Sequence, residues 1–408
     1  MKILLSHPTG NANVRSVLKG LVNAGMLESF YTSLACYPNS ILDSLSRLSV
    51  FSELQRRKFD PALEPYTYIH SLKEVGRVLS SKFGIKSLIR HETGFFSIDA
   101  VYEYAGRKAA ISLSKKKNID AVYAYEDGAL SLFKQAKKMG IECIYDLPIA
   151  YWETGRRLML DEALRLPDWA PTLAGGIKDS QAKLDRKTEE LALADVIVVA
   201  SKFVKDSLPS HATSKKIIFS PFGSPKTSLI STKKRDNTKP LRVLFAGSMG
   251  QRKGLGDLFK AIKLLKSINI QLVVMGSLLA PMKFYEDQIG DFIYEPPRPH
   301  SEVLALMRTC DVFCLPSIVE GRALVMQEAM SEGLPIVITR NTGGEDLVID
   351  GKTGFLVPIS SPEAIAEKLE WFANNRSELE AMSQYSKEHA MNYTWERYAE
   401  TIISGILE

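Results

Sequence analysis

Two glutamates, Glu320 and Glu328, stand eight positions apart in the stretch "EGRALVMQEAMSEGLPIV", which is otherwise apolar and runs into a predicted buried strand. On one continuous helix their side chains would lie about 80° apart, because each residue advances about 100°. If Glu320 instead lies in the loop before the helix, with a break at Gly321, both carboxylates face one cleft at different heights. That geometry suits a ligand with two separated hydroxyl-bearing parts.

Arg252 and Lys253 stand together in "SMGQRKGLG", which follows the apolar run "LRVLFAG" at 241–247. The glycine spacing matches neither a P-loop nor a dinucleotide fingerprint. Two adjacent cations at the carboxyl end of a strand are costly unless they meet a diphosphate or a comparable anion. The alternative is a pair of solvated charges on a turn.

The first apolar run, "KILLSH" at 2–7, is followed by "PTGNANVRS", in which Gly10 and Asn11 lead into a helical pattern. A glycine-containing loop before a helix is a natural anion site, since free backbone N–H groups point outward there. The alternative is a plain tight turn.

The elements that must position these residues are short β-branched runs that alternate with helical patterns. Continuous apolar runs with little alternation are typical of a parallel sheet covered on both faces. Helical spacing is seen at 14–22 and 258–265, and Ser361-Pro362 opens a further helix. We therefore predict an α/β protein with two facing doubly wound Rossmann-like domains and a cleft between them. The predicted strands cover 2–7, 30–35, 121–125, 143–147, 196–201, 216–221, 241–247, 271–276, 292–295, 312–317 and 335–340.

The polar, basic and Pro-bracketed segment 223–240 is predicted to link the two domains. The N-terminal domain would then cover 1–222 and the C-terminal domain 241–385, with helices at 386–408 packing back toward the N-terminal domain. The stretch from about 40 to 115 shows no strand pattern and is predicted to be a helical insertion. It is locally basic, and the cations are Arg56, Arg57, Lys58, Lys73, Arg77, Lys82, Lys86 and Arg90. We favour a solvated surface there, and contact with anionic lipid is the alternative.

Composition sets further bounds. The chain has 408 residues, of which 45% are hydrophobic and 24% charged, so two domains are expected. No apolar run predicts a membrane-spanning helix, and the N-terminal run is too short for a signal peptide. The net charge of +5 is too weak to indicate nucleic acid. The four scattered cysteines are interpreted as core thiols of a cytoplasmic protein.

Three stretches resemble the donor-binding half of the GT-B glycosyltransferases, specifically the retaining family 4. These are "FAGSMGQRKGLGDLFKAI", "LPSIVEGRALVMQEAMSEGLPIVIT" and "GGEDLVIDGKTGFLV". The resemblance is strong over 241–375, and over the first half it is architectural. The pattern of Glu, seven residues and Glu is specific when Ala-Met-x-x-Gly-Leu-Pro follows, as it does here.

The resemblance implies a role for each donor-side residue. Glu320 would contact the hydroxyls of the donor sugar, and Glu328 would accept hydrogen bonds from the ribose of the nucleotide. Arg252 and Lys253 would stabilise the leaving diphosphate as the glycosidic bond breaks. The backbone of Gly321, Arg322, Ala323 and Leu324 would face the diphosphate. The loop 295–303, with Pro297, would contact the nucleobase.

This chain departs from the family in two donor-side places. Ser248 stands where many relatives have an arginine, so Arg252 is expected to supply that charge. The usual Gly-Phe-Gly is Gly-Arg-Ala, so a contact from Arg322 to the donor is expected.

On the acceptor side, Glu126 and Asp127 stand where relatives often have a histidine near the reacting centre. Because ligands bind beyond the carboxyl ends of strands, His7, Asp127 and Asp146 are candidates to orient an acceptor hydroxyl. Local capping is an equal alternative for each of them. The further acceptor-side candidates are Asn11 and Trp152, and core packing is the alternative for Trp152.

The sequence thus predicts a retaining glycosyltransferase that moves a hexose from a UDP- or GDP-sugar to a carbohydrate, lipid-linked or small-molecule hydroxyl. No cofactor or metal is expected, because no Asp-x-Asp pair occurs. No nucleic-acid partner is expected, and peripheral contact with an anionic membrane stays open. The rival interpretations are a nucleotide-sugar epimerase and a non-catalytic nucleotide-sugar-binding subunit.

Overall fold

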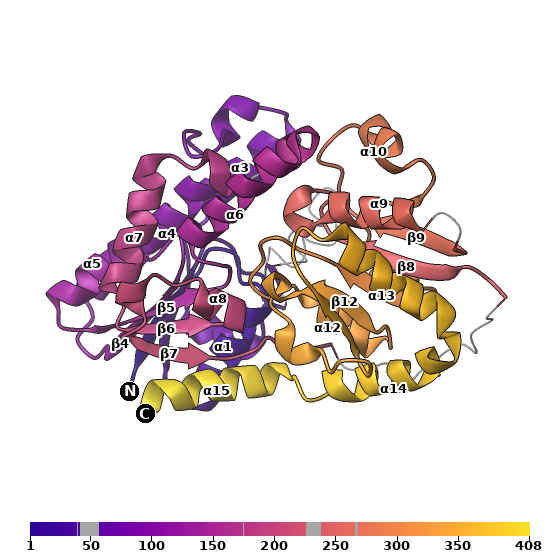
Figure 1. The fold of residues 1–408 in the computed structure, drawn as a ribbon. Helices are drawn as coiled ribbons and strands as arrows, with labels where there is room; N and C mark the ends of the chain where they lie inside the picture. Colours follow the sequence, from indigo (N-terminus) through magenta and orange to yellow (C-terminus); the bar gives the residue numbers. More distant parts are fainter. Residues whose placement is uncertain (39, 41–56, 174, 226–237, 266–267) are drawn as a thin grey trace.

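The computed structural model describes residues 1–38, 40, 57–173, 175–225, 238–265 and 268–408. The chain forms two parallel β-sheets, each covered by helices on both faces (Figure 1). The first sheet has the order β3-β2-β1-β4-β5-β6-β7, and the second β10-β9-β8-β11-β12-β13. The prediction of two doubly wound α/β domains is confirmed.

The strands of the first sheet are β1 (Ile3–Ser6), β2 (Leu27–Thr32), β3 (Thr67–Ile69), β4 (Ala121–Tyr125), β5 (Glu142–Leu147), β6 (Val196–Val199) and β7 (Lys216–Phe219). The helices up to this point are α1 (Ala12–Asn23), α3 (Leu72–Lys82), α4 (Ile98–Leu113), α5 (Leu130–Lys138), α6 (Trp152–Arg165), α7 (Gln181–Leu193) and α8 (Lys202–Asp206). Alternate residues of one strand enter different cores, since Ile3 and Leu5 pack in one buried cluster and Leu4 in another. Burial on both faces explains why these strands read as continuous apolar runs.

The second sheet contains β8 (Leu241–Ala246), β9 (Ile270–Met275), β10 (Ile293–Glu295), β11 (Val312–Leu315), β12 (Ile336–Thr339) and β13 (Gly354–Val357). Its helices are α9 (Leu255–Leu264), α10 (Met282–Ile289), α11 (His300–Met307), α12 (Leu324–Ser331), α13 (Pro362–Asn374), α14 (Leu379–Ala390) and α15 (Trp395–Leu407). In each sheet the strand order reverses beside the first strand, β1 or β8. Ligand sites in such sheets form at this reversal, where two connections diverge.

Several local predictions need correction. The stretch 40–115 does contain a strand, β3, which pairs with β2 at the edge of the sheet. Its residues Tyr68 and Ile69 are exposed, so it does not form the buried apolar run on which the prediction relied. Strand β13 was also missed. The boundary expected at residue 385 falls inside α14, and α15 alone packs against α1 and β7. The linker prediction lies mainly outside the described residues, as does the part of the insertion at 41–56.

The end of α6 and the turn after it dock onto the second domain. Trp169 is buried against Phe259, Phe284 and Tyr285, with ring centroids 4.9–5.9 Å apart. A smaller interdomain core joins Ala150, Met159 and Leu173 to Ile318 and Val319. These contacts set the relative position of the two domains because they bury apolar surface from both.

Among the described residues, no helix combines the length and the apolar character that crossing a membrane requires.

Candidate active site

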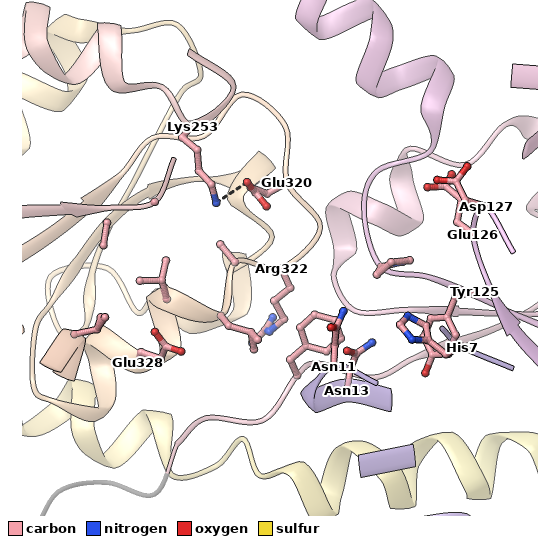
Figure 2. A pocket seen from close by; sticks show the side chains of 18 of the residues that line it. His7, Asn11, Asn13, Tyr125, Glu126, Asp127, Lys253, Glu320, Arg322 and Glu328 are labelled. Carbon is pink, nitrogen blue, oxygen red and sulfur yellow. Dashed lines mark ion pairs between the residues drawn. The ribbon is translucent and has the colours of Figure 1, made fainter. Parts of the chain in front are cut away.

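A cavity of about 660 Å³ lies between the carboxyl ends of the two sheets (Figure 2). It is bounded by loops after β1, β4 and β5 on one side and by loops after β8 and β11, with α12, on the other. Its residues include His7, Asn11, Asn13, Tyr102, Tyr125, Glu126 and Asp127 from the first domain. From the second domain they include Gly247, Lys253, Glu320, Arg322, Ala323, Leu324 and Glu328. Most of the predicted site residues therefore meet in one cavity.

Glu320 lies in the loop before α12, and Arg252 and Lys253 both contact it. Its Oε1 is 2.7 Å from Arg252 Nη1 and 2.6 Å from Lys253 Nζ, and the second contact is drawn in Figure 2. Arg252 also donates to the Val319 carbonyl at 3.0 Å. The two cations thus share one carboxylate, which leaves a local surplus of positive charge. Such a turn is suited to bind an anion.

Two glycines allow these loops to approach one another. Gly254 has φ +73°, and a Cβ there would lie 2.0 Å from the Pro316 carbonyl oxygen. At Gly321 a Cβ would lie 1.7 Å from the Pro148 carbonyl oxygen of the other domain. Gly321 therefore lies at the domain contact, as the backbone break between Glu320 and the helix.

Glu328 lies in α12 at the far end of the cavity from the first domain (Figure 2). Its Oε1 lies 3.1 Å from His300 Nε2 at the start of α11. Burial raises the pKa of Glu328, and the nearby His300 partly offsets this. His300 was not among the predicted site residues, since a lone histidine in a proline-rich loop carries no pattern.

Arg322 is committed to the fold. Its guanidinium is buried and forms hydrogen bonds to Asp346 at 2.7 and 3.0 Å, to Gln327 at 2.9 Å and to the Gly343 carbonyl at 3.1 Å. It also lies over the ring of Tyr393. Arg322 nevertheless belongs to the cavity lining, so a contact from it to the donor stays a prediction, and its guanidinium would have to make that contact in addition to these bonds.

His7 forms the base of the first-domain wall, and its ring has a fixed tautomer. Nδ1 accepts the backbone N–H groups of Thr9 at 3.0 Å and Gly10 at 2.9 Å. Burial, together with the Arg57 charge, lowers the pKa of His7 to about 3. The ring is therefore neutral and carries its proton on Nε2. The N–H of Gly10 is used by His7, so this loop does not offer it to an anion as expected.

Glu126 and Asp127 follow β4 in a strained loop. Asp127 has φ +71°, and the Glu190 carboxylate holds the loop by accepting the N–H groups of Asp127, Ala129 and Leu130 at 2.9–3.0 Å. Burial raises the pKa of Glu190 to about 8. The sequence carries no clear signal for Glu190, since the buried face of α7 also contains Lys183 and Lys187.

Six predicted residues are not part of the cavity lining, namely Gly10, Arg252, Gly321, Asp146, Trp152 and Pro297. Asp146 is buried within β5 and accepts a hydrogen bond from Tyr123 Oη at 2.7 Å. Trp152 donates from Nε1 to Thr188 at 3.2 Å and packs behind the wall. Pro297 is exposed in the loop before α11. Strand β5 ends at Leu147, so Asp146 lies within the strand and its side chain is buried in the core.

One group of metal-ligand atoms occurs in the described part of the chain, at His91, Glu92 and Asp179, and it lies outside the cavity lining. Lys183 Nζ lies 3.3 Å from Asp179 Oδ1, and Ser180 donates its N–H to Glu92 at 3.0 Å. Both carboxylates thus already have partners within the protein.

Residues 227–389 match the family model described as Glycosyl transferases group 1. Over its full length the chain resembles sucrose-phosphate synthase from Thermosynechococcus elongatus, with TM-score 0.66 and 15% identity over 99% of this chain and 98% of the other. It also resembles Anabaena HepE in complex with UDP, with TM-score 0.63 and 14% identity over the whole of both chains. The chain has the GT-B fold.

Curated relatives of similar sequence are named as glycosyltransferases. The capsular polysaccharide biosynthesis glycosyltransferase CapM of Staphylococcus aureus is 26% identical over 53% of this chain and 62% of its own length. A D-inositol 3-phosphate glycosyltransferase of Corynebacterium glutamicum is 26% identical over 69% of this chain and 76% of its own length. The matched parts span from a quarter to about three fifths of the first four curated relatives. These comparisons support a glycosyltransferase.

The buried Asp146 predicts a specific pH dependence of stability. Burial raises its pKa from 3.8 to about 7, with Tyr123 opposing the shift. Between these values the folded protein retains a proton that the unfolded chain releases, so the free energy of unfolding falls as pH rises from about 4 to about 7. Asp146→Asn should reduce this fall by up to about 4 kcal/mol, measured by urea denaturation across that range. The matched control is Asp287→Asn on the surface of α10, where the fall should equal that of the wild type. Equal pH profiles for Asp146→Asn and the wild type would contradict a buried, protonated Asp146.

Proposed function

We propose that the protein is a retaining glycosyltransferase that transfers a hexose from a nucleotide sugar to a hydroxyl acceptor. The observation that carries this proposal is Glu320, held at 2.6–2.7 Å by Lys253 and Arg252 on one wall of an interdomain cavity. The structural similarity to HepE adds support, since HepE was determined in complex with UDP and with UDP-glucose. A UDP- or GDP-sugar is the proposed donor.

In this proposal the donor lies along the second-domain wall. Its ribose hydroxyls would donate hydrogen bonds to Glu328, taking the place of His300 at Oε1. Its diphosphate would contact Arg252 and Lys253, near the N-terminal end of α12, where the helix dipole favours negative charge. The hexose would then lie beside Glu320, which accepts its hydroxyls. Charge that develops on the leaving diphosphate is thus stabilised by groups already in position.

The acceptor would approach from the first-domain wall, where His7, Asn11, Asn13 and Glu126 line the same cavity. In a retaining transfer, the acceptor oxygen bonds the anomeric carbon on the face that the leaving group vacates, the bond from that carbon to the diphosphate oxygen breaks, and the hydroxyl proton would pass to the departing diphosphate. The two walls meet at Gly321 and Pro148, so donor and acceptor would be enclosed together. An epimerase would need acid and base groups around the sugar, and Glu320 is the main carboxylate on the donor wall.

The decisive test is a thermal-shift screen of UDP- and GDP-sugars, followed by NMR of the anomeric configuration of the product. A ligand that binds only the folded protein raises its apparent stability. Stabilisation by one nucleotide sugar and a product with the donor's anomeric configuration would support the proposal. Exchange of solvent deuterium into the sugar without an acceptor would instead favour an epimerase. Binding without transfer or donor hydrolysis would favour a binding subunit.

Glu320 and Glu328 should respond differently to substitution. Glu328→Gln should mainly weaken donor binding, since it weakens an acceptor of ribose hydrogen bonds in ground and transition states alike. Glu320→Gln should lower kcat more than it raises KM, because Glu320 lies beside the reacting sugar. Initial rates over a range of donor concentrations distinguish the two. The control variant is Glu302→Gln, because Glu302 is exposed. Glu332 is unsuitable because it pairs with Arg308. Wild-type kinetics in both variants would contradict the assignment.

We also propose that transfer needs no divalent metal, because Arg252 and Lys253 can balance the charge of the diphosphate. Initial rates in excess EDTA should equal those in Mg²⁺. Arg252→Gln and Lys253→Gln should each lower turnover by about 10²-fold, the size of effect seen for single donors to a developing oxyanion. Lys260→Gln, on α9 and exposed, is the matched control. Activity that disappears in EDTA and returns with Mg²⁺ or Mn²⁺ would contradict the proposal.

A third proposal concerns α3, whose polarity is inverted. Its buried side chains include Glu74, which pairs with Arg57 and Arg77 at 2.5–2.8 Å. Its exposed side chains include Leu72, Val75 and Leu79, which share one face at helical spacing, and Phe83 follows with 76% of its surface exposed. Lys82, Lys86 and Arg90 are also exposed beside this face.

An exposed apolar face bordered by cations fits the interface of an anionic membrane, where apolar side chains enter the acyl boundary and cations meet the headgroups. Arg57 does not belong to this surface, because it pairs with the buried Glu74 and donates to the Thr9 carbonyl. Arg56 lies outside the described residues. We therefore propose peripheral membrane contact through α3 and the residues directly after it.

Vesicle co-sedimentation tests this contact. Binding should require acidic lipid such as phosphatidylglycerol and should fall as salt rises, through screening. Leu79→Glu/Phe83→Glu should weaken binding by at least about tenfold, since each apolar side chain contributes on the order of 1.5–3 kcal/mol when buried. Leu264→Glu, which is exposed on α9, is the control and should bind as the wild type does. Equal binding to neutral and acidic vesicles would contradict contact with anionic lipid, and the interpretation of α3 as a solvated surface would remain.

A further inference from the structure

The first-domain wall of the cavity presents one hydrogen-bond donor with a fixed role. Because His7 Nδ1 accepts two backbone N–H groups, its Nε2 carries the proton of the neutral ring. Tyr125 and Tyr102 pack against the ring edge-to-face at 4.7 and 5.8 Å and hold its orientation. His7 can therefore donate a hydrogen bond into the cavity but cannot supply a positive charge there.

Glu126 supplies an acceptor on the same wall. It is only 8% exposed and lines the cavity, and its Oε1 has no hydrogen-bond partner. The other oxygen, Oε2, lies 3.3 Å from Lys187 Nζ. A buried carboxylate oxygen without a partner costs free energy, so such an atom marks a place where a ligand donor fits.

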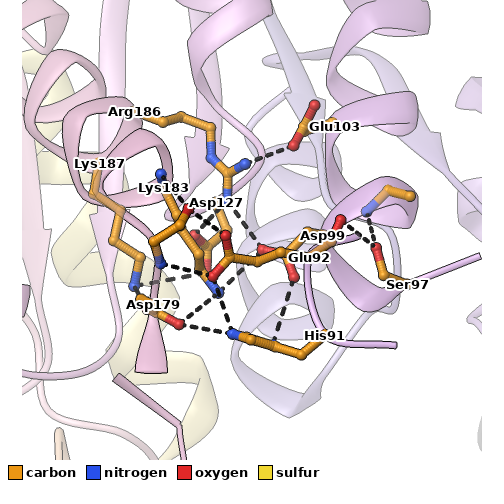
Figure 3. Close-up of polar contacts among 12 residues, drawn as sticks. His91, Glu92, Ser97, Asp99, Glu103, Asp127, Asp179, Lys183, Arg186 and Lys187 are labelled. Carbon is orange, nitrogen blue, oxygen red and sulfur yellow. Dashed lines mark hydrogen bonds and ion pairs between the residues drawn. The ribbon is translucent and has the colours of Figure 1, made fainter. Parts of the chain in front are cut away.

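The cations behind this wall are already paired with carboxylates (Figure 3). Lys183 Nζ lies 3.0 Å from Asp99 and 3.3 Å from Asp179. Arg186 contacts Asp99 and Asp127 at 3.1 Å and Glu103 at 2.5 Å.

Lys187 is shared in the same way between Glu126 at 3.3 Å and Asp127 at 3.8 Å. The carboxylates of this cluster outnumber its three α7 cations, and none of these cations is among the residues that line the cavity. The wall therefore has no surplus positive charge to offer a phosphate.

We infer that the acceptor enters this wall with an uncharged, hydroxyl-bearing part, such as a sugar ring or a polyol without a phosphate group. This inference rests on the proposed glycosyl transfer and names its acceptor class. One acceptor hydroxyl accepts from His7 Nε2–H, and another group of the same molecule donates to Glu126 Oε1. Burial raises the pKa of Glu126 to about 7, so at pH 8, where the probes are compared, a phosphate placed here would meet the ionised Glu126 and Asp127 and would be repelled.

The inference separates this chain from some of its relatives. The relatives named D-inositol 3-phosphate glycosyltransferases are named after a phosphorylated compound. Here the residues after β4 are two carboxylates, and a phosphorylated acceptor would need a cation at that position.

The test compares matched pairs of probes on the full-length protein saturated with UDP. Methyl α-glucopyranoside is paired with glucose 6-phosphate, and myo-inositol with inositol 3-phosphate. Dissociation constants are measured by saturation-transfer NMR. We expect the neutral member of at least one pair to bind about tenfold more tightly than its phosphorylated partner, through the repulsion described above. Tighter binding of the phosphorylated members, or binding of neither neutral probe, would overturn the inference.

Glu126→Gln provides the second arm, because it removes the negative charge and leaves Lys187 less neutralised. We expect this variant to favour the phosphorylated probe by at least about tenfold relative to the wild type. Glu103→Gln, in the same charge cluster but outside the cavity lining, should leave the ratio unchanged. An unchanged ratio in Glu126→Gln overturns the inference.

Binding of UDP-glucose and GDP-mannose to the wild type and to each variant distinguishes failure of the acceptor inference from failure of the proposed function. If the wild type and Glu126→Gln retain nucleotide-sugar binding while phosphorylated probes are preferred, only the acceptor inference fails. If the wild type binds no nucleotide sugar, the proposed function fails.

Discussion

Gln251 joins the two domains at the residue where the cationic turn begins. Its side chain is fully buried, and it donates to Glu162 at 2.9 Å and to Asp257 at 2.8 Å while accepting from the Gly256 N–H at 3.0 Å. Its own N–H donates to Thr172 at 3.0 Å. Glu162 and Thr172 belong to the first domain, so the turn that carries Arg252 and Lys253 is fixed by the domain contact. A buried amide with all of its partners satisfied specifies one arrangement, because any shift would leave polar groups unpaired.

The same contact links the architecture to the chemistry of the cavity. Arg165 bridges Glu162 and Asp257, and Trp169 fills the neighbouring apolar space against α9 and α10. On the opposite edge, Gln327 donates to Phe222 and Ser224 of the connection, and it holds Arg322 at its other end. The two domains are thus joined by hydrogen bonds on both sides of the cavity, and its two walls face each other. Opposed walls of this kind suit a reaction between two bound molecules.

The two walls differ in their electrostatic character, and this difference organises the proposed reaction. On the donor wall, two cations share one carboxylate, so positive charge is in surplus where a leaving diphosphate would lie. On the other wall, the α7 cations are outnumbered by carboxylates, and the histidine is neutral because burial and Arg57 lower its pKa to about 3. An anionic donor and an uncharged acceptor would each find one matching wall. In the proposed reaction, this difference in charge would assign the donor and the acceptor to different walls.

The sequence alone determined the strand and helix pattern and the placement of Glu320 and Glu328, because these depend on local periodicity and on glycine breaks. All eleven strand runs predicted from apolar composition occur as strands, whereas β13 and the exposed edge strand β3 were not predicted. Tertiary structure decided what each polar side chain does. Arg322 donates to Asp346, and Asp146 accepts from Tyr123 in the core. Glu190 accepts an N–H group from a loop about 60 residues away in the sequence. His300 reached Glu328 from another helix. The physical reason is that the pattern of neighbouring residues in the sequence decides whether a residue lies in a strand or a helix. The partners that satisfy a buried charge come from distant segments, and only the folded chain brings them together.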